Sequence, residues 1–254
     1  MSRLHQATSL SYPPAAVADH SIGPTSAGQG TAEQAPFGEG VIDREEVRTR
    51  YRRLRAVSRA HNNAVLQAVP KKVLIHWGKR LGLVRRKTFI FEGEEELSLL
   101  ADLAVYSARP GKAAPVERYR KTKSYAAGST EAVMLDAMCD WRFSLFVVRR
   151  PHRTAGLVLY DLFRQEDVWL MDEGLEKTAP AGMALASRVT KPDAFHMTTG
   201  AALPLGEADL EETAALFSDG GANPFVDGGR NVKFVETVYR AAVTHSLLTG
   251  IRYE

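Results

Sequence analysis

The sequence is poor in the residue types that build several common kinds of site. Cys139 is its only cysteine, which excludes both a disulfide within the chain and a cysteine-rich zinc site. The seven histidines are scattered, and none forms an HxH or HxxxH pair of the kind that binds a metal locally. We therefore expect no metal and no other cofactor, and a single thiol fits a reducing, cytoplasmic compartment.

Long apolar runs are also missing. No window approaches the roughly 18 apolar residues that a membrane span requires. The first 21 residues lack the continuous apolar core of a signal peptide. The glycine pairs at 220–221 and 228–229 lack the Lys-Ser/Thr ending of a phosphate-binding loop. We expect a cytoplasmic protein that does not associate with membranes.

The residues that are present divide the chain into four regions. Residues 1–40 are rich in Ser, Ala, Gly, Pro and Thr, and they predict a disordered tail because few large apolar residues offset the entropy of ordering. Residues 41–142 predict a basic helical region, residues 143–206 a small β module, and residues 207–254 C-terminal helices. The fold class expected is therefore α+β.

Local signals mark where the helices begin and end. Asp43 is a candidate N-cap with acidic residues in the first turn after it, and Pro70 fits the first turn of a second helix. Gly82 is placed to end that helix, whereas Ser129 and Asn231 are candidate caps of later ones. A short strand is predicted at 88–91, and further helices at 93–106, 116–123, 131–141, 207–217 and 232–248.

Short apolar runs separated by Pro, Gly and charged residues occupy the segment from Phe143 to Leu205. This pattern predicts four or five short strands that form a small antiparallel β barrel or a rolled sheet. The strand over 143–148 carries apolar groups on both faces, so we expect burial on both sides, one of them by the preceding helix. Gly156 permits a bend, and 180–182 predicts a turn.

The order of these runs resembles a module found in uncharacterised bacterial proteins that often carry a SEC-C zinc motif as well. The residues that carry the resemblance are Phe143, Ser144, Leu145, Gly156, Leu159, Asp161, Leu162, Gly182, Leu185 and Arg188. The SEC-C cysteines are absent from this chain. The resemblance therefore implies a fold, and it implies neither a zinc site nor an activity.

A basic segment with few acidic neighbours is the strongest functional signal. Its candidate nucleic-acid-binding residues are Arg48, Arg52, Arg55, Arg59, Lys71, Lys72, Arg85, Arg86 and Lys87. The first four recur every three or four residues and share one helical face, where a polyanion would relieve their mutual repulsion. The alternative is a solvated helix face, or one paired with the acidic residues at 92 and 94–96.

Catalytic candidates are few, and each has a structural alternative. His196 can pair with Asp172 or Cys139. The structural alternatives are that His196 is a half-buried strand residue and that Cys139 is a buried thiol that packs as a small hydrophobic residue. A second group can hold a divalent cation or act in acid–base chemistry, and it consists of Asp161, Asp167, Asp172 and Glu173. Its positions at predicted turns favour solvated turn residues.

Taken together, these patterns predict a non-enzymatic binding or adaptor protein with an unidentified protein partner. Two alternatives stay open. One is a nucleic-acid-binding protein that uses the basic region from Arg48 to Lys87, and the other is an enzyme whose site is assembled from residues distant in the sequence.

Overall fold

The structure, a computed structural model, describes residues 43–109, 111–206 and 230–244. The predicted tail at 1–40, the predicted helix at 207–217, the glycine-rich loop at 218–229 and the predicted end of the last helix lie outside the described residues. Among the described residues, no helix combines the length and the apolar character that crossing a bilayer requires.

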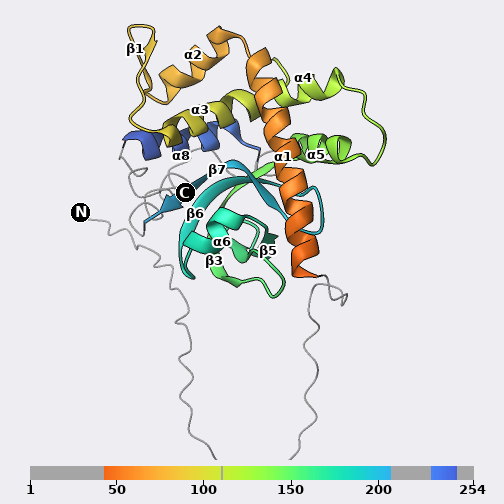
Figure 1. Cartoon of the computed structure of the whole chain (residues 1–254). Helices are drawn as coiled ribbons and strands as arrows, with labels where there is room; N and C mark the ends of the chain where they lie inside the picture. The colour runs from red at the N-terminus through yellow and green to blue at the C-terminus, as the bar shows by residue number, and fades with distance from the viewer. Residues whose placement is uncertain (1–42, 110, 207–229, 245–254) are drawn as a thin grey trace, which may run out of the picture. The chain divides into compact units, whose positions relative to one another are not determined.

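Helices and strands are both present, so the α+β class is confirmed (Figure 1). The described helices are α1 (Arg44–Ala68), α2 (Lys71–Arg80), α3 (Glu94–Tyr106), α4 (Pro115–Lys121), α5 (Thr130–Cys139), α6 (Glu173–Thr178) and α8 (Val232–Thr244). The strands are β1 (Val84–Arg85), β2 (Thr88–Phe89), β3 (Arg142–Pro151), β4 (Leu157–Asp161), β5 (Glu166–Leu170), β6 (Ala184–Thr190) and β7 (Met197–Leu205).

Five strands form one antiparallel sheet in the order β5-β4-β3-β6-β7, and β1 and β2 form a separate hairpin. A single parallel bridge joins Leu170, at the end of the edge strand β5, to His196, just before the opposite edge strand β7. The Met171 amide donates to the His196 carbonyl at 2.8 Å across this contact. The two edges therefore touch at one point, and the described strands do not confirm a closed barrel.

The sheet is buried on both faces, as the apolar pattern of the segment now seen as β3 predicts. Phe143 and Leu145 belong to the core that the helices share, whereas Phe146 and Val148 belong to a second cluster with residues of β4, β5 and β6. α3 packs on β7, and α1 contacts both α3 and α5, so the helices cover one side of the sheet (Figure 1).

The predicted helix boundaries agree with the structure to within two residues where it describes them. Ser129 accepts a hydrogen bond from the Ala132 amide at 3.2 Å, and Asn231 accepts from Lys233 and Phe234 at 3.0 and 3.2 Å. Gly82 ends α2 with a φ of +83°, a conformation that glycine adopts without strain. Asp43 occupies the N-cap position of α1 but makes no side-chain capping hydrogen bond.

The β module holds one element that the sequence did not predict and one residue whose predicted exposure was wrong. α6 follows β5, and Asp172 caps it. Asp161 is fully buried rather than solvated. It accepts hydrogen bonds from the Phe163 and Arg164 amides, both at 3.1 Å, and so stabilises the turn that leads from β4 to β5.

A buried ion pair connects the sheet to the helices. Arg188 of β6 is 0% exposed, and its Nη2 lies 2.9 Å from Oδ2 of Asp102 in α3. The Asp102 carboxylate also accepts hydrogen bonds from Thr199 of β7 at 2.8 Å and from the hydroxyl of Tyr239 in α8 at 3.0 Å. One carboxylate therefore contacts side chains from two strands and another helix.

Aromatic rings complete the surroundings of this guanidinium. The Arg188 Cζ atom lies 3.8 Å from the Trp141 ring centroid and 5.0 Å from that of Tyr106. Burial and the nearby Asp102 charge raise the pKa values of Tyr106 and Tyr239, so both hydroxyls stay protonated as donors. These contacts offset part of the cost of burying a charge.

We predict that Asp102→Asn is strongly destabilising, because it leaves the Arg188 charge buried without a counter-charge. The expected loss in the free energy of unfolding is about 3–5 kcal/mol, measured by urea denaturation. The double variant Asp102→Leu/Arg188→Met removes both charges and should cost less than Asp102→Asn alone. A double variant at least as unstable as the single one would contradict this account.

Candidate functional site

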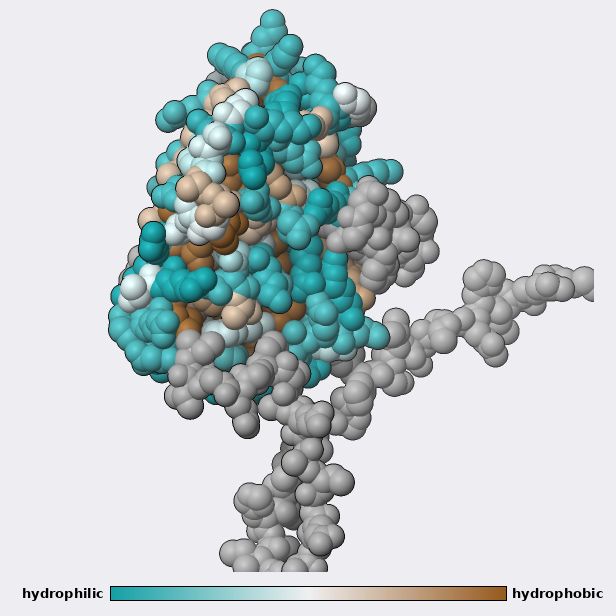
Figure 2. Space-filling view, turned by 90° about the vertical axis from the view of Figure 1, so that its right-hand side faces the viewer, coloured by the Kyte–Doolittle hydropathy of each residue, from teal (hydrophilic) through white to brown (hydrophobic). Residues whose placement is uncertain are grey.

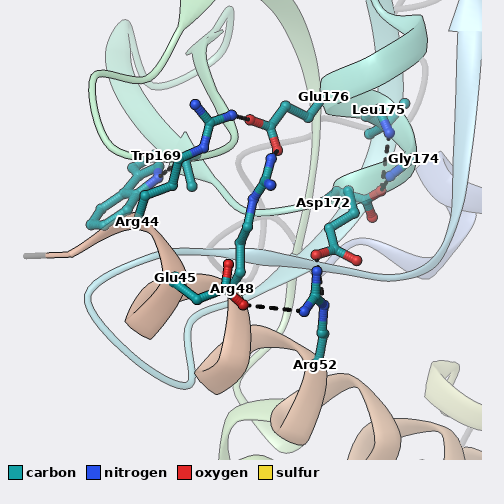
Figure 3. Close-up of polar contacts among 11 residues, drawn as sticks. Arg44, Glu45, Arg48, Arg52, Trp169, Asp172, Gly174, Leu175 and Glu176 are labelled. Atoms are coloured by element: carbon teal, nitrogen blue, oxygen red, sulfur yellow. Dashed lines mark hydrogen bonds and ion pairs between the residues drawn. The ribbon is translucent and has the colours of Figure 1, made fainter.

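The carboxylates that face α1 come from α6, a helix of six residues between β5 and β6. Asp172 follows the end of β5 and caps α6, accepting hydrogen bonds from the Gly174 and Leu175 amides, both at 3.1 Å. Glu173 and Glu176 lie in the first turn, where acidic side chains suit the positive end of the helix dipole. Figure 3 shows this acidic end of α6 facing the arginines of α1.

Ion pairs connect the first turns of α1 to α6. Arg44 and Arg48 both reach Glu176, at 2.9 and 3.2 Å (Figure 3). Arg52 lies 2.9 Å from Glu173. The acidic residues of α6 therefore neutralise much of the α1 arginine face within the molecule.

Arg55 is the most constrained member of this face. Its Nη2 donates to Asp172 Oδ2 at 2.9 Å and its Nη1 to the Thr198 carbonyl at 2.6 Å. The Asp172 carboxylate also accepts from the Thr198 hydroxyl at 2.9 Å. The side chains of Arg55 and Asp172 are only 13% and 17% exposed. Arg55 thus joins α1, the start of α6 and β7, and it is poorly placed to reach a ligand.

The α1 face pairs with partners that the sequence did not indicate. The alternative of pairing with acidic residues at 92 and 94–96 is not what the structure shows, because the partners of Arg48, Arg52 and Arg55 lie in or beside α6. Arg59 is exposed and makes no ion pair within the described part of the chain. An Asp followed by glutamates is a helix-start signal that could have revealed α6.

The side of the molecule that carries α1, α4 and α5 is mainly hydrophilic. Figure 2 shows hydrophilic residues over most of this face, with hydrophobic residues interspersed among them. No broad apolar patch is visible on it among the described residues. This face therefore combines matched charges with a mixed polar surface, which does not single it out as a binding site.

The rest of the predicted basic set lies on α2 and on the β1–β2 hairpin. All five side chains are exposed, and none makes an ion pair with another described residue: Lys71, Lys72, Arg85, Arg86 and Lys87. The segment 47–91 contains no Asp or Glu. We call these five residues the basic hairpin surface.

The hairpin turn holds two basic residues in a strained conformation. Arg85 pairs with Thr88, so Arg86 and Lys87 form a two-residue loop. Their φ angles are +47° and +68°, in the left-handed region that favours glycine or asparagine. Each such residue costs on the order of 1–3 kcal/mol. Such outliers cluster at functional sites, so the turn is a candidate for one.

Apolar side chains lie beside the same turn. Phe89 packs on α2, where a side-chain carbon at Gly78 would come within 2.7 Å of its ring. Phe91 stacks on Phe89 with centroids 5.7 Å apart. Ile90 and Phe91 are 45% and 38% exposed. Basic and exposed aromatic side chains therefore occur together at this end of the described structure.

The predicted catalytic pairs are not formed. Asp172 is occupied by Arg55 and Thr198, and the charged groups that act on His196 are the cations Arg142, Lys191 and Arg164. Burial, with the charges of Glu117 and Asp136, raises the pKa of Cys139 to about 11, so its thiol stays protonated. A protonated thiol is a poor nucleophile.

The acidic candidates of the β module also have separate partners. Asp161 accepts from Ser144, Asp167 lies 3.2 Å from Arg149, and Glu173 pairs with Arg52. Over the described ranges, no group of three or more His, Cys, Asp or Glu residues is arranged to hold a metal ion. These carboxylates act in ion pairs and turns.

Comparison with known proteins identifies a family whose function is unknown. Residues 45–212 match a family of unknown function, DUF7986. No curated protein and no solved structure matches the chain. The matched segment includes α1 from Glu45 onward, the hairpin, the sheet and the Arg188–Asp102 pair. Nothing in the match concerns a SEC-C motif.

We predict that Arg55→Ala destabilises the protein more than Arg52→Ala. Arg55 loses hydrogen bonds to a partly buried carboxylate, which are worth about 1.5–3 kcal/mol. Arg52 is 54% exposed, so solvent screens its pair with Glu173 and little change is expected. Urea denaturation of the two variants measures the difference. Equal losses would show that burial does not set the strength of these pairs.

We predict that stability falls as the pH drops below the ordinary histidine pKa of about 6.5. Burial lowers the pKa of His196 to about 3 and that of His152 to about 4. Both therefore take up protons more readily in the unfolded chain, so their stabilisation is complete above about pH 6.5 and declines towards the folded-state pKa values.

The measurement is the free energy of unfolding between about pH 7 and pH 4. His196→Gln and His152→Gln should each reduce the slope of stability against pH, because each removes one of these two groups. A slope that does not change in either variant would contradict the assignment.

Proposed function

Because the chain belongs to DUF7986, a family of unknown function, we propose from its geometry that it is a non-enzymatic binding protein that holds nucleic acid on the basic hairpin surface. The observation that carries this proposal is the division of the basic set. Arg48, Arg52 and Arg55 of α1 pair with carboxylates in or beside α6. Lys71, Lys72 and the three hairpin cations, like Arg59, make no ion pair among the described residues.

Unpaired, exposed cations favour a polyanionic ligand. Neutralising phosphates releases condensed counterions, and this entropy gain drives sequence-independent binding to nucleic acid. A cation that already pairs with a carboxylate contributes less to the free energy of binding, because the phosphate must first replace that carboxylate. The exposed residues of α2 and the hairpin therefore supply more binding free energy than the α1 face does.

The strained turn supports the same surface. Asn-Gly would occupy these two φ-positive positions at lower cost than Arg86-Lys87. Here the chain carries two long cationic side chains at the tip instead. We interpret the turn as one in which stability is given up for the placement of charge.

The exposed aromatic side chain gives the surface a second mode of contact. Phe91 is 38% exposed and lies next to the basic turn. Bases of a single strand stack on aromatic rings with little dependence on sequence. We therefore propose single-stranded nucleic acid as the preferred form.

A protein partner is the second candidate, and it would make the chain an adaptor. The exposed large hydrophobic residues of the described structure, Ile90, Phe91 and Leu97, all lie between residues 90 and 97. In this case binding would depend on apolar contact and only weakly on salt.

We also propose that the protein acts in the bacterial cytoplasm and that it is related to proteins that carry a SEC-C motif.

The double variant Arg86→Asn/Lys87→Gly tests the nucleic-acid proposal. It removes two charges, so affinity for nucleic acid should fall. It also relieves two strained positions, so the free energy of unfolding should rise by about 1 kcal/mol or more. Fluorescence anisotropy with single-stranded and duplex oligonucleotides over a salt series measures affinity. The slope of log K against log salt should decrease in magnitude by about one unit per lost phosphate contact.

Lys177→Gln/Lys191→Gln is the matched control, because it removes the same charge from two exposed lysines of the β module. It should leave the salt slope nearly unchanged. Absence of oligonucleotide binding at low salt, or equal losses in the two double variants, would overturn the proposal.

A further inference from the structure

We propose that a second site, a cavity between α2 and α8, binds a phosphate group. The cavity is wide open to solvent and has a volume of about 410 Å³, and four exposed residues line it: His76, Lys79, Arg80 and Arg240. All four lining residues are basic types. A cavity of this composition is suited to a small, highly charged anion.

The spacing of the lining residues places them together. His76, Lys79 and Arg80 lie three and four positions apart, so they share one face of α2. Arg240 reaches the same cavity from α8, a helix more than 150 positions away in the sequence. Cationic groups from two helices therefore converge on one volume.

A buried carboxylate holds one of these cations in place. Arg80 Nε donates to Glu236 Oε1 at 2.7 Å, and Arg80 Nη2 lies 2.6 Å from the same oxygen. Glu236 is only 5% exposed. This pair cancels one positive charge, but Lys79 and Arg240 make no ion pair with any described residue. The cavity therefore retains excess positive charge beside a guanidinium of fixed orientation.

The cavity is separate from the β1–β2 hairpin, although Lys72 lies four positions before His76 and so shares the α2 face that lines it. The hairpin packs against Gly78, since a side-chain carbon there would meet Phe89 and Val84 at 2.7 Å. Gly78 is two positions from both His76 and Arg80, which is about 200° around the helix. Phosphate binding in the cavity thus does not depend on the proposed function of the hairpin.

Phosphate is the ligand class that best fits these donors. Its oxygens accept several charge-assisted hydrogen bonds at once, and guanidinium and ammonium groups are its usual protein partners. The phosphate can belong to a small molecule or to the end of a nucleic-acid strand. Both sources present the same dianionic group, so the experiment has to separate them.

The test is a titration of the full chain with inorganic phosphate at constant ionic strength, followed by calorimetry or NMR. Arg240→Gln and, separately, Lys79→Gln should each weaken phosphate binding by about tenfold or more. Arg53→Gln removes the same charge from an exposed arginine of α1 and should leave binding unchanged. Because Arg240 and Lys79 are exposed, we expect both variants to fold, and circular dichroism checks this.

A second arm compares oligonucleotides that differ only in a 5′-phosphate or a 5′-hydroxyl. Tighter binding of the phosphorylated strand, lost in Arg240→Gln, supports the cavity with a nucleic-acid end as its ligand. Phosphate binding without that preference supports it with a small phosphate compound. No saturable binding of phosphate, or equal weakening in Arg53→Gln, overturns the proposal.

The hairpin variant Arg86→Asn/Lys87→Gly keeps the two proposals distinguishable. It should bind inorganic phosphate as the unaltered chain does. If this variant loses oligonucleotide binding and keeps phosphate binding, both proposed sites are supported. If the unaltered chain binds oligonucleotides but not phosphate, only the proposal for the cavity is overturned.

Discussion

The ion pair between Arg188 and Asp102 is the contact on which the described fold most depends. It is buried between the sheet and the helices, and Thr199 and Tyr239 bond to the same carboxylate. A buried charge is tolerated only when its partner is held at short range, so the elements that carry these residues must keep their relative positions. The Trp141 ring covers the guanidinium and closes this arrangement.

The same rule explains how the surface charges divide. Arg55 forms a partly buried ion pair with Asp172 because α6 lies against α1. For the same reason Arg52 pairs with Glu173, and Arg48 pairs with Glu176. The hairpin cations make no ion pair with another described residue, and all three are exposed to solvent. Burial and pairing thus separate arginines that hold the fold together from cations that a ligand can reach.

Some elements could be predicted because their signals are local. The strand at 143–148, the caps at Ser129 and Asn231, and the end of α2 at Gly82 depend on residues within a few positions of each other. The helix at 173–178 was missed because an apolar strand runs directly into it, and the burial of Asp161 was missed because turn position normally implies exposure. In the candidate site, the basic residues were visible in the sequence, but their partners were not.

The sequence by itself determined the α+β class, the single thiol and the concentration of positive charge between residues 47 and 91, because composition and short-range periodicity carry that information. Only the tertiary structure decided which of those charges are matched. The partners of Arg48, Arg52 and Arg55 lie more than 100 positions away in the sequence, and Arg240 meets α2 only through the packing of α8. Ion pairing depends on distance in space, and chain connectivity alone does not specify that distance.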